Sequence, residues 1–453
     1  MSEFLHGVEV IEAQSGTRPV KTVKSSVIGV IGTAPLADTT AFPANTPVLI
    51  AGKRADAMKL VDTKGAAYQT LLNEAKTKAG DDARLETSAE YLAAVEAFKA
   101  ANGKDADYVL SAEEKTAIQD KVEEQARNAV TDIDDAKKGS LLRAIDGIFD
   151  QAGAAVVVIR VEGADDSAAT SAMVGSDTQP KAIEAFLGSE SVLGVTPRIL
   201  VAPGFSHQKA VADELIAVAE RLRAVVIADG PNDSDQKAAE YRNEFGSRRL
   251  FLVDPQVNVL KGDKLQAEPA SARVAGLIAK SDNDRGFWWS PSNTAINGIA
   301  GTARPVDFQL GDPLASANQL NSKDVATIIR QNGFKLWGNR TCSSDPKWAF
   351  LSVVRTADMI NDSLQRAHMW AVDRNITKTY IEDVTQSVQS YLDNLKAQGA
   401  ILGGEIWADE EQNTPENIQA GKVFFSFDFT PPTPAEHITF KSIMTNNYLE
   451  EIV

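Results

Sequence analysis

The last hundred residues contain two extended segments that do not complete a sheet between them. Residues 423–429, Val-Phe-Phe-Ser-Phe-Asp-Phe, combine aromatic residues with partial alternation, a pattern typical of a strand. The strand is stopped by the run Pro-Pro-Thr-Pro at residues 431–434, because proline has a fixed φ and no N–H donor. A second apolar extended run follows at residues 437–444. Extended ends with unpaired backbone groups pair with exposed sheet edges, often on another copy, so the sequence predicts self-assembly.

The N-terminal residues have the same character. Residues 6–12 are predicted to form a strand. Ser15 and Gly16 then form a turn, and Pro19 interrupts the extended chain after it. We therefore expect both ends to donate strands to neighbouring subunits. The strands expected to receive them are residues 401–407 and 423–429. The expected donor residues are Val8, Val10, Ile438 and Phe440. The expected receiving residues are Ile401, Ile406, Val423, Phe425 and Phe427.

Length and composition restrict the class of protein. A chain of 453 residues exceeds the size of one hydrophobic core, which predicts about two to four domains. No apolar run approaches the roughly 20 residues that span a bilayer, so no membrane partner is expected. The net charge of −16 argues against general nucleic-acid binding, because phosphates require a basic surface. Cys342 is the single cysteine, which excludes an internal disulfide and favours folding in a reducing cytosol.

The middle of the chain predicts a layered α/β domain over residues 25–61 and 139–285. Continuous apolar runs are typical of strands that are buried on both faces. Helical periodicity alternates with these runs, for example at 209–222, and this alternation predicts layers of helices on a sheet. The runs expected to be strands are residues 27–31, 48–50, 154–159, 198–201, 225–228 and 250–253.

Residues 62–138 are predicted to form a helical surface insertion. The segment is rich in alanine and charged residues, and capping boxes mark two helix starts, Thr87 with Glu90 and Ser111 with Glu114. An α+β C-terminal domain is expected over residues 286–435, with long helices near 349–372 and 378–398. The boundaries leave an N-terminal arm of residues 1–24 and a C-terminal arm of residues 436–453. The expected fold class is therefore a multidomain α/β protein with extended arms.

Candidate chemical sites are weak. Gly29 and Gly32 follow an apolar run but lack the glycine spacing of a dinucleotide loop, so a tight turn is the preferred interpretation. No Walker-type phosphate loop occurs. His368 has no second ligand at metal spacing and is interpreted as a helix-packing residue. Cys342 has no neighbouring base and is interpreted as a buried small residue. No cofactor and no catalytic residue are predicted.

One segment partly matches a calcium-binding loop. Asp105, Asp107, Ser111 and Glu114 match positions 3, 5, 9 and 12 of an EF-hand loop. The first position is Gly103, which has no carboxylate, and the turn glycine of such a loop is absent. A solvated loop that ends in a helix cap is therefore preferred to a metal site.

Several ordered motifs resemble those of sheath proteins of contractile bacteriophage tails. The most specific are Leu-Trp-Gly-Asn-Arg-Thr-Cys-Ser at residues 336–343, Ala-His-Met-Trp-Ala-Val-Asp at 367–373, and Ala-Gly-Lys at 420–422 leading to Asp-Phe-Thr-Pro at 428–431. The other matching segments are His-Gly-Val-Glu-Val at 6–10, Gly-Thr-Arg at 16–18, Val-Ile-Arg-Val-Glu at 158–162 and Pro-Arg-Ile-Leu at 197–200. The insertion at 62–138 departs from compact members of that family.

The resemblance implies a structural protein without catalysis. Six copies would form a ring around an inner tube, rings would stack helically, and the C-terminal domain would lie against the tube. The implied partners are further copies of the chain, the inner tail tube protein, the baseplate and the tail terminator. The implied location is the tail sheath of a virion assembled in the bacterial cytoplasm, where contraction drives the tube through the host envelope.

The sequence leaves two alternatives to a bacteriophage tail sheath. The same resemblance fits the sheath of a headless bacteriocin-type injection device. A cytosolic α/β enzyme is the alternative from another class, with a cleft near Asp229 and Asp254 at the carboxyl ends of strands, where such sheets bind ligands.

Overall fold

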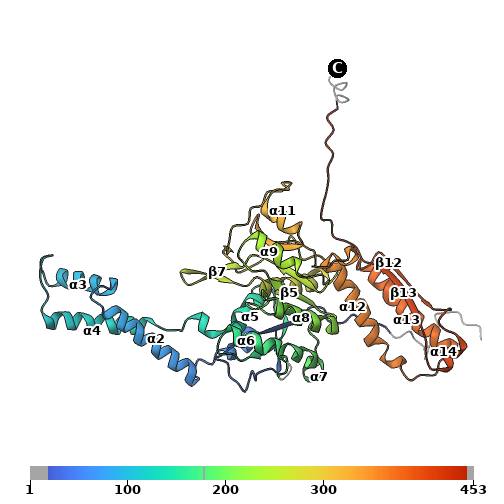
Figure 1. Ribbon diagram of the computed structural model, residues 1–453, viewed down its shortest axis with the longest axis horizontal. Coiled ribbons are helices and arrows are strands. Elements are labelled where there is room, and N and C mark those ends of the chain that lie inside the picture. Colours follow the sequence, from blue (N-terminus) through green and yellow to red (C-terminus); the bar gives the residue numbers. More distant parts are fainter. Residues whose placement is uncertain (1–18, 177–178, 446–453) are drawn as a thin grey trace, which may run out of the picture. The chain divides into compact units, whose positions relative to one another are not determined.

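The computed structural model describes residues 19–176 and 179–445 of the chain (Figure 1). The described residues divide into two compact units. The central unit comprises residues 25–280 and 291–344. The C-terminal unit comprises residues 19–24, 281–290 and 345–445. The predicted boundary at 286 therefore differs from the observed division, because residues 291–344 belong to the central unit.

The central unit is built on an eight-stranded sheet. Its strand order is β11-β10-β6-β5-β4-β1-β3-β2, with bounds β1 Ile28–Thr33, β2 Pro47–Ala51, β3 Ala155–Val161, β4 Ile199–Val201, β5 Val225–Asp229, β6 Leu250–Val253, β10 Val325–Arg330 and β11 Phe334–Trp337. The six inner strands are parallel, and the edge strands β2 and β11 are antiparallel to their neighbours.

The sequence accounts for the inner strands of this sheet. β4, β5 and β6 are buried at every position, as expected for parallel strands that are covered on both faces. All six strands predicted for the α/β domain lie in the sheet. The predicted helix at residues 209–222 is confirmed as α8 (Lys209–Leu222), and it buries Val211, Leu215 and Val218.

Two strands of this sheet, β10 and β11, were not predicted from the sequence. β10 and β11 lie in the region that was predicted to belong to the C-terminal domain. β10 nevertheless pairs in parallel with β6, through Val325 opposite Leu252. A second, smaller sheet of the central unit has the order β8-β7-β9, with bounds β7 Val257–Lys261, β8 Lys264–Glu268 and β9 Gly301–Thr302. The remaining α-helices that begin in the central unit, outside the lobe described next, are α1 Arg54–Ala57, α5 Leu141–Phe149, α6 Asp166–Val174, α7 Ser189–Leu193, α9 Asp235–Asn243, α10 Ser271–Arg285 and α11 Ser316–Asn321; the end of α10 belongs to the C-terminal unit.

Residues 62–138 form a helical lobe of α2 (Ala66–Arg84), α3 (Ala89–Ala101) and α4 (Ala112–Ala129). α2 and α4 lie side by side, as Figure 1 shows. The Ser111 capping box at the start of α4 is confirmed. The capping box predicted at Thr87 is wrong: the N-cap of α3 is Ser88, whose hydroxyl accepts from the Tyr91 N–H. Thr87 and Ser88 are adjacent and both carry a hydroxyl group, so the sequence alone did not determine which of them caps α3.

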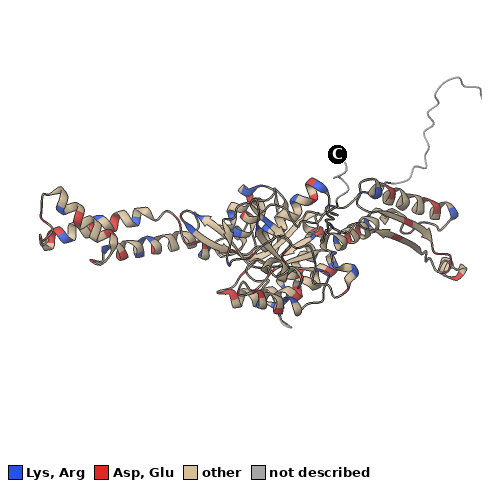
Figure 2. Cartoon of the chain, turned by 90° about the horizontal axis from the view of Figure 1, so that it is seen from above, with Lys and Arg blue, Asp and Glu red and all other residues tan. Residues whose placement is uncertain are grey.

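The lobe has a thin apolar core and a charged surface. Tyr91, Ile118 and Val122 are buried and contact Val95 and Phe98. Lys, Arg, Asp and Glu residues are interspersed along its helices (Figure 2).

The C-terminal unit packs two long helices against a two-stranded sheet. Its elements are α12 Leu351–Ala367, α13 Lys378–Ala397, β12 Gly403–Ala408, α14 Pro415–Gln419 and β13 Phe425–Thr430. Gly399 follows α13 with φ of 77°, the left-handed conformation that glycine adopts readily where a helix ends. None of the helices in the described ranges has the length and apolar character needed to span a bilayer.

Candidate assembly interface

The sheet of the C-terminal unit has only two strands. β12 and β13 pair antiparallel, with Ile406 opposite Phe427. An isolated pair of strands is marginal in water unless a third strand or a helix supports it. α13 supplies this support on one face through the cluster of Val388, Leu392 and Leu395. The outer edges of the two strands have no neighbouring strand in the described part of the chain.

Side chains alternate across this sheet. Phe425, Phe427 and Phe429 are partly buried and pack against the cluster beneath the sheet. Ser426 and Asp428 lie between them on the opposite face, because successive residues of a strand point to opposite sides. Phe427 and Phe429 stack with ring centroids 6.0 Å apart. The aromatic composition that predicted a strand therefore builds the helix-facing side of the sheet.

The residues predicted as receiving strands lie in and beside this sheet. Ile406 is in β12, and Phe425 and Phe427 are in β13. Ile401 precedes β12 and is buried, whereas Val423 precedes β13 and is half-buried.

The predicted donor residues of the C-terminal arm lie in a segment without regular structure. Residues 436–445 have no helix or strand. The exposed fraction is 68% for Ile438 and 92% for Phe440. Large apolar side chains at this exposure gain stability when they are covered, by about 1.5–3 kcal/mol each. The predicted N-terminal donors, Val8 and Val10, lie outside the described residues.

Residues 19–24 pack within the C-terminal unit. Val20 and Val23 contact its apolar cluster. The Val23 N–H donates to the Ser363 hydroxyl over 3.1 Å, and the Thr22 and Tyr391 hydroxyls lie 3.2 Å apart. The chain that enters from the N-terminus is therefore held against α12 and α13 before it reaches the central unit.

Asp229 and Asp254 were the candidate residues for an enzyme. Asp229 is fully buried at the end of β5, where one carboxylate oxygen accepts from the Ser271 N–H at 2.8 Å. The other oxygen accepts from the hydroxyls of Ser271 at 2.6 Å and Ser206 at 3.2 Å. Asp254 accepts from the Arg304 guanidinium and, at 2.8 Å, from the Asn232 N–H. Both carboxylates thus fasten loops and the start of α10 to the sheet, and neither is available to a substrate.

Burial raises the pKa of Asp229 to about 6, and the hydrogen bonds from Ser271 and Ser206 only partly oppose this increase. A raised pKa means that the folded protein holds a proton that the unfolded chain releases between pH 3.8 and 6. Stability should therefore fall as pH rises through this window, by about 3 kcal/mol in total. Asp229→Asn should remove this dependence. An amide oxygen still accepts from Ser271, and its NH₂ group donates to a hydroxyl.

We expect the free energy of unfolding of Asp229→Asn to equal that of the wild type near pH 4. At pH 7.5 it should exceed the wild-type value by about 1–3 kcal/mol. Urea unfolding followed by circular dichroism at both pH values measures this difference. Asp229→Ala is the matched control. It should destabilise the protein at both pH values, because the Ser271 N–H loses its acceptor. The same difference between Asp229→Asn and wild type at both pH values would contradict the assignment.

The surroundings of Cys342 and His368 indicate structural roles for both side chains. Cys342 is fully buried in the apolar core of the central unit, and burial raises the pKa of its thiol to about 12. The His368 Nδ1 atom lies 2.7 Å from the Leu364 carbonyl oxygen at the end of α12. The predictions of a buried cysteine and a helix-packing histidine agree with these positions.

Gly29 and Gly32 lie inside β1 instead of in a turn after it. A Cβ atom at Gly29 would lie 2.7 Å from the Phe186 ring and 2.8 Å from Leu200. At Gly32 it would collide with the Ser140 hydroxyl. The glycines therefore allow neighbouring elements to pack closely on the strand, and the predicted turn is wrong.

The loop considered for calcium ends in the helix cap that the sequence favoured. One Glu114 carboxylate oxygen accepts from the Ser111 N–H at 2.8 Å, and the Tyr108 hydroxyl also donates to this carboxylate. Among residues 19–176 and 179–445, no group of three or more His, Cys, Asp or Glu side chains is arranged to hold a metal ion.

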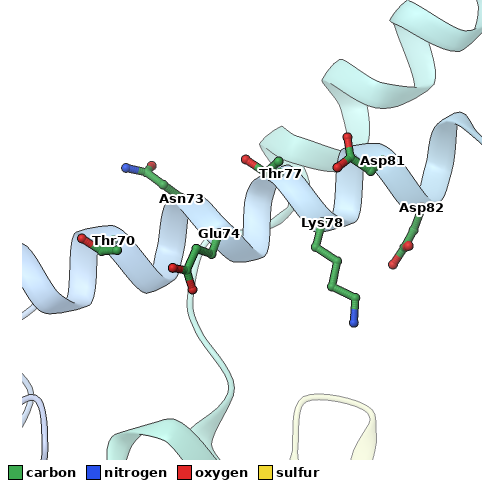
Figure 3. Close-up of a pocket in the computed structure, with 7 residues that line it drawn as sticks. All are labelled: Thr70, Asn73, Glu74, Thr77, Lys78, Asp81 and Asp82. Carbon is green, nitrogen blue, oxygen red and sulfur yellow. The ribbon is translucent and has the colours of Figure 1, made fainter.

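A shallow hollow lies along α2 of the helical lobe. Figure 3 shows that its side chains all come from this helix: Thr70, Asn73, Glu74, Thr77, Lys78, Asp81 and Asp82. All seven residues are exposed, and no second element closes the hollow. It is a groove in a helix surface and does not form a substrate pocket.

The fold is that of a contractile sheath subunit. The chain is similar to the helical sheath protein of the anti-feeding prophage in the contracted state, with a TM-score of 0.62, 18% identity, and coverage of 98% of this chain and 100% of that one. It is also similar to the contracted PVC sheath of an extracellular contractile injection system, with a TM-score of 0.61, 15% identity, and coverage of 98% and 99%.

Sequence comparisons give the family. The phage tail sheath protein central domain matches residues 175–342, and the phage tail sheath C-terminal domain matches residues 343–445. A putative prophage major tail sheath protein of Pseudomonas aeruginosa is 44% identical over 69% of this chain and 83% of its own length. The tail sheath protein of Escherichia phage P2 is 32% identical over 100% of this chain and 98% of its own length. The chain belongs to the phage tail sheath protein family. It is a contractile sheath subunit, and thus a structural protein instead of an enzyme.

These comparisons also bear on the internal organisation. The boundary between the two family domains, at 342/343, lies close to the boundary between the structural units at 344/345.

Proposed function

We propose that this chain polymerises as stacked hexameric rings around an inner tail tube, and that contraction of the polymer drives the tube through the host cell envelope. The inner tail tube protein, the baseplate and the tail terminator are its proposed partners besides further copies of itself. It would assemble in the bacterial host cytoplasm and function in the tail sheath of the virion.

One observation carries the proposal within the family. Among the described residues, the C-terminal unit presents a two-stranded sheet with no third strand, and the exposed segment 436–445 pairs with no strand. A strand added from another copy would satisfy backbone groups at the edge of that sheet and cover apolar side chains. We therefore propose Ile438 and Phe440 as donors of one arm and Val8 and Val10 as donors of the other. β12 and β13 are the proposed receivers.

The proposed layout places the C-terminal unit next to the tube and the helical lobe on the outside of the sheath. The lobe's charged surface and thin core suit a position in contact with water. Such a layout needs no cofactor and no nucleic acid, because contraction would draw on subunit packing.

Negative-stain electron microscopy of the overexpressed chain tests the proposal. We expect hollow, striated cylinders with sixfold symmetry in cross-section. A protein that stays monomeric at every concentration and ionic strength would contradict it.

A headless contractile injection device is the second candidate. The structural likeness to the anti-feeding prophage and PVC sheaths favours it. Particles purified from the native host distinguish the two: capsid-bearing tails support a phage, and uniformly headless tails support the injection device.

A further inference from the structure

The outer edge of β12 is occupied by a side chain. Gln389 of α13 reaches this edge, and its Nε2 atom donates to the Gly404 carbonyl at 3.2 Å. Its Oε1 atom accepts from the Ile406 N–H, also at 3.2 Å. A carbonyl and the N–H two residues further along lie on the same edge of a strand, and an added strand uses both. One side-chain amide therefore fills the hydrogen-bonding sites of a neighbouring strand.

The orientation of this amide is determined by a second contact on α13. The Gln389 Nε2 atom also donates to the Asp393 carboxylate at 3.1 Å. A carboxylate accepts hydrogen bonds and does not donate them when ionised, so the NH₂ side of the amide must face Asp393. The carbonyl side is then directed at Ile406. Asp393 therefore keeps the amide in the orientation that matches the strand edge.

The outer edge of β13 has no such side chain. The Glu405 N–H lies on the β13 side of β12, where it donates to the Asp428 carboxylate at 3.1 Å. Backbone direction alternates along a strand, so Gly404 and Ile406 face outward on β12, and Phe427 and Phe429 face outward on β13. Among the residues that the structure describes, no side chain bonds to the backbone of Phe427 or Phe429. The two edges of the sheet are thus unequal.

We propose, on the basis of the proposed sheath function, that Gln389 blocks the β12 edge of the unassembled subunit and must leave it before a neighbour's strand pairs there. The occupant is an arm of a second copy of this chain. The β13 edge is open for addition at once, whereas addition at β12 requires two hydrogen bonds of the Gln389 amide to break. Strand addition is therefore ordered, and premature pairing of dilute subunits through β12 is suppressed.

Gln389→Met tests this proposal, because methionine keeps the length of the side chain and removes the amide. In dilute subunits, we expect the Ile406 amide to exchange with deuterium about five-fold faster than in the wild type, since one hydrogen bond is lost. Exchange at Glu405, which bonds towards β13, should not change. The threshold concentration for sheath formation, measured by sedimentation, should fall about five-fold.

Two further variants separate this effect from altered folding. Gln386→Met makes the same change at an exposed position one turn earlier on α13 and should alter neither measurement. Asp393→Ala keeps Gln389 but removes the acceptor that orients it, and should give smaller changes in the same directions. Unchanged exchange at Ile406 in Gln389→Met, or faster exchange with an unchanged assembly threshold, would overturn the proposal.

Failure of the sheath function itself gives a different result. If wild-type protein forms no cylinders, the proposed function fails, and the edge is tested with synthetic peptides of residues 1–18 and 436–453. At least one peptide should then bind Gln389→Met about five-fold more tightly than the wild type. Equal affinities for both proteins would reject the blocking role.

Discussion

A subunit that lacks residues 1–18 is expected to fold and to form no sheath. The deletion stops before the segment 19–24, whose Val20 and Val23 pack against the apolar cluster of the C-terminal unit. The folded subunit therefore keeps these contacts, but it loses the arm that contains Val8 and Val10. A polymer that depends on strands added from neighbours cannot propagate without a donor. Electron microscopy and sedimentation should show monomers at concentrations at which the full chain forms cylinders.

A longer deletion of residues 1–24 is the informative comparison. It also removes the hydrogen bond from Val23 to Ser363 and exposes part of the cluster between α12 and α13. We expect this version to be destabilised by about 2–4 kcal/mol, since two valine side chains leave the core. Normal cylinders from the chain without residues 1–18 would exclude the N-terminal arm as a donor.

The substitution Arg355→Met is expected to destabilise the C-terminal unit by about 3–5 kcal/mol. The Arg355 guanidinium makes two parallel hydrogen bonds to the Asp282 carboxylate, at 2.6 Å and 2.5 Å. The side chains are 4% and 2% exposed. Removing the arginine leaves a buried carboxylate without its counter-charge, and the cost of that desolvated charge is large. Urea unfolding monitored by tryptophan fluorescence is suitable, since Trp288, Trp289, Trp348, Trp370 and Trp407 belong to this unit.

Two controls define what the ion pair contributes. The double variant Arg355→Met with Asp282→Leu should recover most of the lost stability, because it leaves no unpaired charge. Lys378→Met removes one partner of an exposed pair on α13, with the atoms 3.8 Å apart, and should change stability by less than about 0.5 kcal/mol. A loss of stability as large for Lys378→Met as for Arg355→Met would show that burial does not determine the effect.

Much of the central unit could be predicted from local pattern. The apolar runs at β4, β5 and β6 are continuous because both faces of those strands are covered, so the sequence itself reports that they are buried. The apolar stripe of α8 likewise gives the helix and its core-facing side. The capping box of Ser111 and Glu114 marks a helix start with two reciprocal hydrogen bonds within four residues.

The candidate site could be predicted only in part. The aromatic strand β13 and the exposed donor segment were recognisable from composition and from the prolines between them. Gln389 was not recognisable, because a glutamine on a helix carries no local signal of what its amide contacts. Its partners Gly404 and Ile406 lie in another element, and they meet it only after α13 packs on β12.

The sequence by itself determined the parallel strands, the long helices, the aromatic strand and the family, because apolar periodicity and ordered motifs are local properties of the chain. The tertiary structure alone decided that β10 and β11 join the central sheet, that Asp229 is held by Ser206 and Ser271, and that Gln389 occupies the edge of β12. These pairings connect residues that are distant in the chain or lie in different elements. Which buried polar groups meet is decided by how the elements pack, and no local pattern records it.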